Sequence, residues 1–295
     1  MKHILLIPHI NVLNANALSS PYTVGFPAMS AWLGATHALE RKLRAAEYDK
    51  VHFKSMAVVC HNIDLQTYKG NGDYVHSIIG TGNPLDKNGN RPSFIEEARC
   101  HLDISLVMEC EGLGIIDEDD FTEWVDQLIQ GKMKLAGGDI LKNQASELIE
   151  VDDETSRRKL LRRLMPGYCL IERRDLMKKA MQEGQDAIDA LLEYLKVTQS
   201  SELDENEKVT WTSSRREKGW IVPIATGFHG ITDLGIAENQ RDPDTPHRFA
   251  ESIVTLGEFV MPYRIKDLDQ MLWHYHTDLE NNLYLCQQIK PTIEI

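Results

Sequence analysis

Apolar and polar positions in the first half of the chain follow two periods, one typical of strands and one of helices. His3 to Val12 is rich in apolar and β-branched residues, which predicts a strand. Apolar residues recur at helical spacing from Ala28 to Arg44, with charges in the last turns, so this segment predicts a helix. Between Ala98 and Met108 the alternation is almost complete, as in an antiparallel strand with one buried face. Asp117 to Gln130 predicts a second helix, because carboxylates at its start are favoured by the helix dipole.

Turn-forming residues mark the connections between these elements. Leu13 to Pro27 is a polar, small-residue loop. Strands are predicted at Lys54 to Leu65 and at Asp73 to Ile79, and the Gly-Asn-Gly between them predicts a protruding hairpin. A further strand at residues 132–140 breaks at Gly137. The order strand, helix, two or more strands, helix, strand predicts an α+β protein with an RRM-like or ferredoxin-like core and an inserted hairpin.

The second half predicts additional helical segments. Helices are expected at Glu154 to Leu164 and Asp175 to Lys196, with a short strand between them, and the polar, acidic Val197 to Lys208 predicts a linker. Residues 219–230 predict a strand that runs into a glycine-rich loop, and the remainder is expected to be mostly helical to His276. We therefore expect the RRM-like core with its hairpin at 1–150, and a section at 151–295 that completes the same globular unit.

Composition narrows the class of protein. A chain of 295 residues with 42% hydrophobic content can bury a full core. No stretch approaches the roughly 18–20 apolar residues of a membrane span, so no membrane association is predicted, and a cytoplasmic location is expected. The five cysteines form no CxxC pair, which predicts neither a disulfide framework nor a zinc cluster. No cofactor and no metal site is expected.

The distribution of charge matters more than its sum. A net charge of −13 argues against a protein that coats nucleic acid indiscriminately. Eleven acidic residues against one basic lie from Glu96 to Asp126, whereas nine basic against two acidic lie from Arg157 to Lys179. Because salt screens charges over roughly 8 Å, a local basic patch can still bind phosphate.

Two segments carry candidate nucleic-acid contacts. The loop after the first strand offers amide and hydroxyl groups that can read base edges, at Asn14, Asn16, Ser19 and Ser20. The alternative is a turn network in which these groups bond to the loop itself. The basic run around Arg162 and Arg163 has an apolar helical face, so its positive face can contact RNA or an acidic partner. The alternative is a solvated face paired with the acidic segment upstream.

No strong enzyme motif occurs, since Walker, GxSxG and HExxH patterns are missing from the sequence. His274 and His276 lack a third ligand at a characteristic spacing, so packing is the expected role. His229 is the histidine whose glycine-rich setting suits close phosphate approach. A ribonuclease would need a general base, a general acid and a cation. Because one histidine is not such a set, a structural or RNA-contacting role is predicted.

Several segments resemble one known family. They are ILLIPHINVLNANALSSPYTVGFPAMSAWLGATHALERK, MKLAGGDIL, RRLMPGY, GWIVPI, RDPDTPHRF, LGEF and LWHYH. In this order they resemble the motifs of the second Csy protein of type I-F CRISPR systems, over residues 4 to about 276. The resemblance implies a Cas-five-like RAMP fold, with an RRM-like core and a β-hairpin thumb.

The resemblance also implies a non-catalytic subunit of the Csy surveillance (Cascade) complex in antiviral defence. Such a subunit holds the 5′ handle of the crRNA, pairs with the large Csy subunit, lies beside the backbone Csy subunits, and meets target double-stranded DNA through the assembled complex. Asn14, Asn16 and Ser19 are then expected near bases. Arg162, Arg163, Arg241 and Arg248 are expected on phosphates or partner carboxylates. Two alternatives stay open: a RAMP ribonuclease that processes pre-crRNA with His229, and an adaptor that contacts only protein.

Overall fold

The computed structural model describes residues 1–46, 48–79, 85–91, 97–114, 117–203, 208–238, 240 and 242–288. The strands are β1 (Lys2–Asn16), β2 (Leu18–Ser20), β3 (Thr23–Val24), β4 (His52–Leu65), β5 (Thr67–Tyr68), β6 (Ser77–Ile78), β7 (Arg99–Glu111), β8 (Lys134–Leu135), β9 (Gly138–Lys142), β10 (Glu147–Val151), β11 (Tyr168–Glu172), β12 (Thr198–Leu203), β13 (Val209–Ser214), β14 (Trp220–Gly230), β15 (Ala250–Val260), β16 (Trp273–Asp278) and β17 (Leu283–Gln288). The helices are α1 (Met29–Arg44), α2 (Glu118–Lys132), α3 (Glu154–Arg163), α4 (Arg174–Gln182) and α5 (Ala187–Leu195), with 3-10 turns η1 (Pro262–Arg264) and η2 (Leu268–Gln270).

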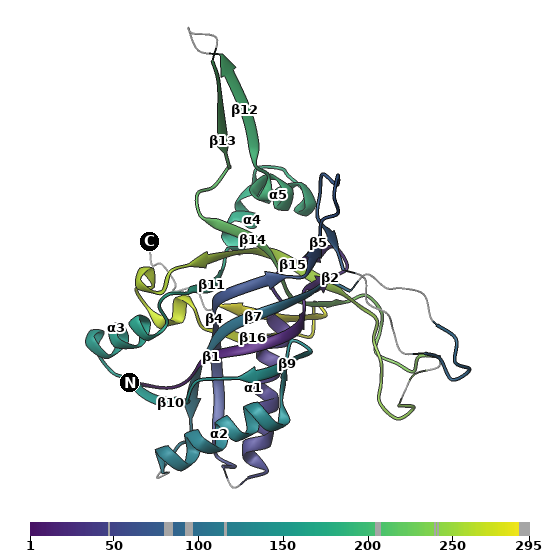
Figure 1. Cartoon of the computed structure of the whole chain (residues 1–295). Helices are drawn as coiled ribbons and strands as arrows, with labels where there is room; N and C mark the ends of the chain where they lie inside the picture. The colour runs from purple at the N-terminus through teal and green to yellow at the C-terminus, as the bar shows by residue number, and fades with distance from the viewer. Residues whose placement is uncertain are drawn as a thin grey trace.

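Antiparallel pairing joins most strands into one large sheet (Figure 1). β1 lies between β7 on one side and β9 and β10 on the other, and β7 pairs in turn with β4. Beyond β4 the pairings close into a ring, which runs β4, β11, β15, β14, β17, β16 and back to β4. The molecule is therefore of mixed α and β structure around an antiparallel sheet, which agrees with the α+β class expected from the sequence.

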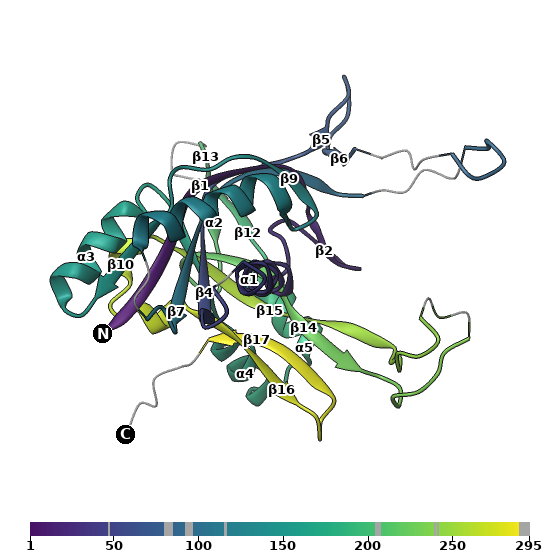
Figure 2. The same ribbon diagram turned by 90° about the horizontal axis from the view of Figure 1, so that it is seen from below.

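Helices cover the sheet unevenly. α1 and α2 pack on one face of β1, β4 and β7, and they come forward in Figure 2. Trp32 of α1 and Phe121 of α2 are fully buried in this core. On the opposite face α3 and the 3-10 turns bury only the first half of β1, including Ile4 and Leu6. α4 and α5 pack on β14 and β15 in a third, smaller core.

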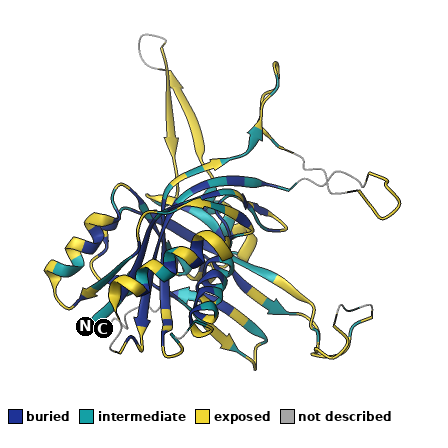
Figure 3. Cartoon of the chain, turned by 60° about the horizontal axis from the view of Figure 1, so that its bottom comes forward, coloured by how far each residue is buried: buried dark blue, intermediate teal, exposed yellow. Residues whose placement is uncertain are grey.

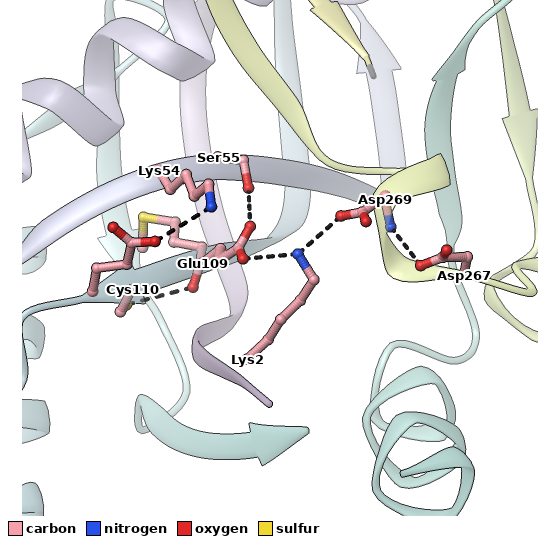
Figure 4. A network of polar contacts seen from close by, with 9 residues as sticks. Lys2, Lys54, Ser55, Glu109, Cys110, Asp267 and Asp269 are labelled. Carbon is pink, nitrogen blue, oxygen red and sulfur yellow. Dashed lines mark hydrogen bonds and ion pairs between the residues drawn. The ribbon is translucent and has the colours of Figure 1, made fainter. Parts of the chain in front are cut away.

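A charged network joins the start of the chain to its last third (Figure 4). Lys2 Nζ lies 2.7 Å from Glu109 Oε1 and 2.9 Å from Asp269 Oδ1. Ser55 donates a hydrogen bond of 2.7 Å to the second oxygen of Glu109. Burial opposes the charge on Lys2, but hydrogen bonds to both carboxylates outweigh it and raise the pKa of the ammonium. The network therefore ties β1 and β7 to η2.

Several sequence predictions are confirmed. The first strand, the two early helices and the strand near residue 100 appear as β1, α1, α2 and β7. The strand expected at residues 219–230 is β14. α2 begins as predicted, because the Asp117 side chain accepts hydrogen bonds from the backbone of Asp119 and Asp120.

Three predictions are wrong. The helix expected from Asp175 to Lys196 is divided into α4 and α5, because Gly184 adopts a φ of +96° and Asp186 caps a new helix. The expected helical end of the chain is mostly strand, as β15, β16 and β17. Of the expected linker, residues 198–203 form β12, while residues 204–207 lie outside the described residues.

Among the described helices, none is both long and apolar enough to cross a membrane.

Candidate nucleic-acid interface

Two β-bulges lie at the same level of β7. Between Ile7 and Ile10 the register of β1 shifts, so Pro8 and His9 both lie opposite Ser105. His9 there has a φ of 48°, in the left-handed region. On the other side of β7, β4 shifts register between Cys60 and Asn62, which makes His61 the extra residue. A bulge bends its strand and redirects a side chain, so these two can bring His9 and His61 toward each other.

The two imidazoles stack across the intervening strand. Strands two apart in a sheet are separated by roughly 10 Å. The ring centroids of His9 and His61 are nevertheless only 4.1 Å apart, at an interplanar angle of 23°. Both rings therefore lean inward over β7.

The hydrogen bonds of this cluster run in one direction. The Pro166 carbonyl can only accept, so His61 Nδ1 donates to it at 2.6 Å. In the neutral ring, His61 Nε2 accepts from the Ser105 hydroxyl at 2.7 Å, and Ser105 Oγ accepts from the His9 backbone N–H at 3.0 Å. Burial, together with the neighbouring His9, lowers the pKa of His61, which favours the same state.

His9 is oriented by a carboxylate. Its Nδ1 lies 3.1 Å from each oxygen of Asp103 and donates to them. Further along β1, Asn14 adopts a φ of 56° at a second bulge, and its backbone N–H donates to His101 Nδ1 at 3.1 Å. The polar contacts thus extend from the end of α3 to the last residues of β1.

The second half of the three central strands leaves a polar face outside the cover of α3. In the register, Asn11 of β1 and Asn62 of β4 both lie opposite Asp103 of β7, so the three share this face. We name this face the polar track. It consists of His9, Asn11, Asn14, His61, Asn62, Asp64, His101, Asp103 and Ser105. Except for the buried Ser105, these residues are half-buried or exposed, so a ligand can reach them.

The predicted loop residues differ in how their polar groups are used. Both amide atoms of Asn16 bond to the backbone of Leu18. Ser19 and Ser20 each bond to the Thr23 hydroxyl, at 2.9 and 2.6 Å. The turn network left open by the sequence is therefore present at these three residues. The exposed Asn14 side chain has no hydrogen bond within the described part of the chain.

The basic run forms α3 as expected, with a capping box between Asp153 and Ser156. The Ser156 N–H donates to the Asp153 carboxylate, and this hydrogen bond lowers the pKa of Asp153. Leu160 and Leu161 face the core. α3 ends beside the polar track, because Pro166 contacts His61.

The two predicted arginines of α3 are not equivalent. Arg163 forms an ion pair with Glu147 of β10. Arg162 forms no ion pair among the described residues, and it lines a cleft of about 450 Å³ between α3 and η1. Four cationic side chains and one carboxylate line this cleft. They are Arg157, Arg158, Arg162, Lys266 and Glu154.

The cleft combines positive charge with an aromatic ring. Tyr263 of η1 lines it and is mostly exposed. The buried Nε of Arg157 has no hydrogen-bond partner within the described residues. Arg158 is held by Glu154 at 2.5 Å. The cleft is thus suited to an anion such as phosphate.

His229 and Arg248 lie away from α3. His229 lies near the end of β14 and pairs with Glu251 at 3.4 Å, and Arg248 donates to Asn282 at 2.6 Å. Figure 1 places this end of β14 and β15 on the side opposite α3. Tyr22 bonds to the backbone of Ser252, which holds the β2–β3 hairpin beside β15. Arg241 lies outside the described residues.

Sequence reasoning missed the stacked histidines and their partners, Asp103 and Ser105. A signal was present, since Pro8 interrupts an otherwise regular strand and proline within a strand marks an edge or a bulge. His61, its partner on β4, is marked by no comparable signal in the sequence.

Cys60, buried beside this region, is a free thiol, and burial raises its pKa to about 12. Within the described residues no cluster of His, Cys, Asp and Glu could hold a metal ion.

Fold and site define an antiparallel α+β protein whose central strands expose a polar face beside a basic cleft. The chain matches the family described as CRISPR-associated protein (Cas_Csy2) over residues 5–286. It is 32% identical over 310 residues to the CRISPR-associated protein Csy2 of Pseudomonas aeruginosa (strain UCBPP-PA14), covering 95% of this chain and 94% of that relative. The chain therefore belongs to the Csy2 family, whose members are subunits of the type I-F Csy complex, and the resemblance found in the sequence is confirmed.

Proposed function

We propose that this subunit binds the 5′ handle of the guide RNA, pairs with the large Csy subunit in the cytoplasm, and cleaves no RNA. The observation that carries this proposal is the polar track, because it presents imidazoles and amides on an uncovered sheet face. Single-stranded RNA is recognised by stacking of its bases and by hydrogen bonds to their edges. Asn11, Asn14 and Asn62 can supply such hydrogen bonds, and His101 can stack.

The central strands support an RRM-like RAMP core. Their spatial order is β4, β7, β1 and β10, with α1 and α2 on one face. This is the arrangement expected of a strand, helix, strand, strand, helix, strand unit of the ferredoxin-like type. In an RRM the sheet face opposite the helices binds bases, and here that face carries the polar track.

Phosphates require a different part of the surface. The polar track contains Asp64 and Asp103, and carboxylates repel a phosphodiester chain. The cleft beside α3 has a cationic excess, and Arg162 is available there. Bases on the polar track and a phosphate at Arg162 therefore form one consistent path, since Pro166 links the two regions.

Binding without cleavage is supported by the surroundings of His229. The side chain that contacts it is Glu251, a carboxylate, whereas a ribonuclease needs a cation for the leaving phosphate. Incubation of the purified protein with labelled repeat RNA separates the alternatives. Full-length RNA retained in a complex supports the proposal, whereas specific cleavage products would favour the ribonuclease.

Two neighbouring arginines provide a matched test of the RNA path. Arg162→Ala should weaken guide-RNA binding about tenfold and reduce the slope of log affinity against log salt by about one. Arg163→Ala should change the affinity less than twofold, because its guanidinium is held by Glu147. Equal effects of the two changes would contradict the assignment. Binding is measured with the subunit assembled on its protein partners, at several salt concentrations.

A further inference from the structure

β12 and β13 form a two-stranded ribbon that stands away from the rest of the molecule (Figure 1). Every described residue of both strands is exposed, as the yellow colour of the ribbon in Figure 3 shows. Side-chain hydrogen bonds of Gln199 and Ser200 go to Ser213 and Thr212 on the opposite strand. The ribbon is therefore held by its own contacts.

The two faces of the ribbon differ in chemistry. Residues directly opposite in an antiparallel pair share a face, and alternate residues share it along each strand. Leu203 lies opposite Val209, and Ser201 lies opposite Trp211, so Leu203, Val209 and Trp211 lie on one face. Gln199, Ser201 and Ser213 share this face, and its apolar part is nearest the tip of the ribbon. We call it the apolar face. The opposite face carries only threonine, serine and glutamate, at Thr198, Ser200, Glu202, Thr210, Thr212 and Ser214.

Such a division is typical of a sheet with one covered face. Here Leu203 is 69% exposed, Trp211 is 68% exposed and Val209 is 47% exposed. An isolated two-stranded hairpin gains little stability in water, and three apolar side chains in solvent add none. The apolar face is therefore suited to contact outside this chain.

The base of the ribbon is attached to α4 and α5 through Arg216. Arg216, which follows β13, lies 2.5 Å from Glu183 and 3.0 Å from Gln185, at the end of α4. Its guanidinium also lies 4.7 Å from the ring centroid of the buried Tyr194 of α5. Because its base is held by these contacts, the ribbon keeps its apolar face in one orientation before binding, which lowers the entropy cost of docking.

We propose that the ribbon docks its apolar face, centred on Trp211, into an apolar socket rimmed by lysine or arginine on another protein subunit of the Csy complex. Charge argues against RNA as the occupant, because the strands carry Glu202 and no cation, and the sequence between them, Asp-Glu-Asn-Glu-Lys, has three carboxylates against one lysine. A second copy of this chain is disfavoured by its net charge of −13. The inference rests on membership of the Csy family and is independent of where the guide RNA binds.

The test uses the assembled complex, with the other purified Csy subunits and a guide RNA as probes. Trp211→Ala should weaken incorporation of this subunit at least tenfold, because a central tryptophan commonly dominates an interface. Thr210→Ala, one residue away on the polar face, is the matched control and should change incorporation less than twofold. Incorporation is measured by titration and size-exclusion chromatography.

A second measurement keeps the proposal open to refutation if Trp211→Ala disturbs the ribbon itself. A photo-crosslinking phenylalanine analogue at position 211 retains an aromatic ring and should crosslink to a lysine- or arginine-rich segment of another subunit. Crosslinks to RNA or to a second copy of this chain would overturn the proposal, as would equal incorporation of both alanine variants. Guide-RNA affinity measured on the same samples distinguishes this failure from failure of the RNA-binding proposal.

Discussion

The first and second halves of the central strands face different surroundings. In the first half of β1, Leu5 and Ile7 pack against the core under α1 and α2, while Ile4 and Leu6 pack under α3. In the second half the α1 side remains apolar, but the opposite side is the polar track. The same strands are thus buried on both faces at one end and on one face at the other. We therefore expect the first half to contribute more to stability, whereas the second half leaves a face that a ligand can reach.

The largest effect is expected where burial is two-sided. Leu6→Ala should lower the free energy of unfolding by about 2–5 kcal/mol, because it leaves a cavity beneath α3. Asn62→Ala on the exposed side of β4 is the control and should stay within about 0.5 kcal/mol. Urea denaturation measures both, and similar losses would mean that the two halves are not distinct.

A smaller loss is expected at the boundary between the halves. Ser105→Ala removes the partner of the His9 N–H and of His61 Nε2, so it should cost about 1–3 kcal/mol. Ser105→Thr retains a hydroxyl and is the control. If Ser105→Ala is neutral by thermal unfolding, the hydrogen-bonded cluster does not stabilise the bulges.

Stability should also depend on pH through the half-buried imidazole of His61. Burial lowers the folded-state pKa of His61, so below the usual histidine pKa the unfolded chain binds more protons than the folded one. Stability should therefore fall as the pH drops from about 7 toward the lowered value, by at most about 1.4 kcal/mol per pH unit for one proton. His61→Gln, whose amide can replace both hydrogen bonds, should flatten this dependence in melting curves. An unchanged slope would assign it to His274, whose pKa burial also lowers.

The smallest change in stability is expected at the exposed end of the track. Asn14→Gly suits the positive φ at this position and should alter the free energy of unfolding by less than about 1 kcal/mol. It should nevertheless reduce the preference for the cognate 5′ handle over a scrambled RNA of equal length. Competition binding at one fixed salt concentration measures this preference. An undiminished preference would show that Asn14 does not read a base.

The sequence predicted best what depends on local periodicity. Trp32 and Leu39 identified α1, and the alternation after Ala98 identified β7. The end of the chain was wrongly predicted as helix, and its strands carry buried polar residues that interrupt a strand-like alternation. Glu258 in β15, for example, is buried and forms an ion pair with Arg173 from a distant segment. A pairing between residues so far apart in the sequence cannot be recognised from the local pattern of apolar and polar positions.

The candidate site was predictable only in part, for a related reason. Asn14 and Arg162 were identified by residue type and remain available in the structure. The amide of Asn16 is used by the loop, which residue type does not reveal. The stack of His9 on His61 requires two bulges at one level of β7, and bulge positions depend on register between strands far apart in the chain.

The closed ring of strands has a consequence for synthesis on the ribosome. β1, β4 and β7 can associate once Glu111 has emerged, but the outer edge of β4 then lacks β11 and β16. That edge stays open while much of the polypeptide is still being translated, and an open edge invites pairing with other nascent chains. The ring closes only when β17 joins β14 to β16. A ribosome stalled before Leu283 would therefore hold a subunit whose barrel-like end is unsealed.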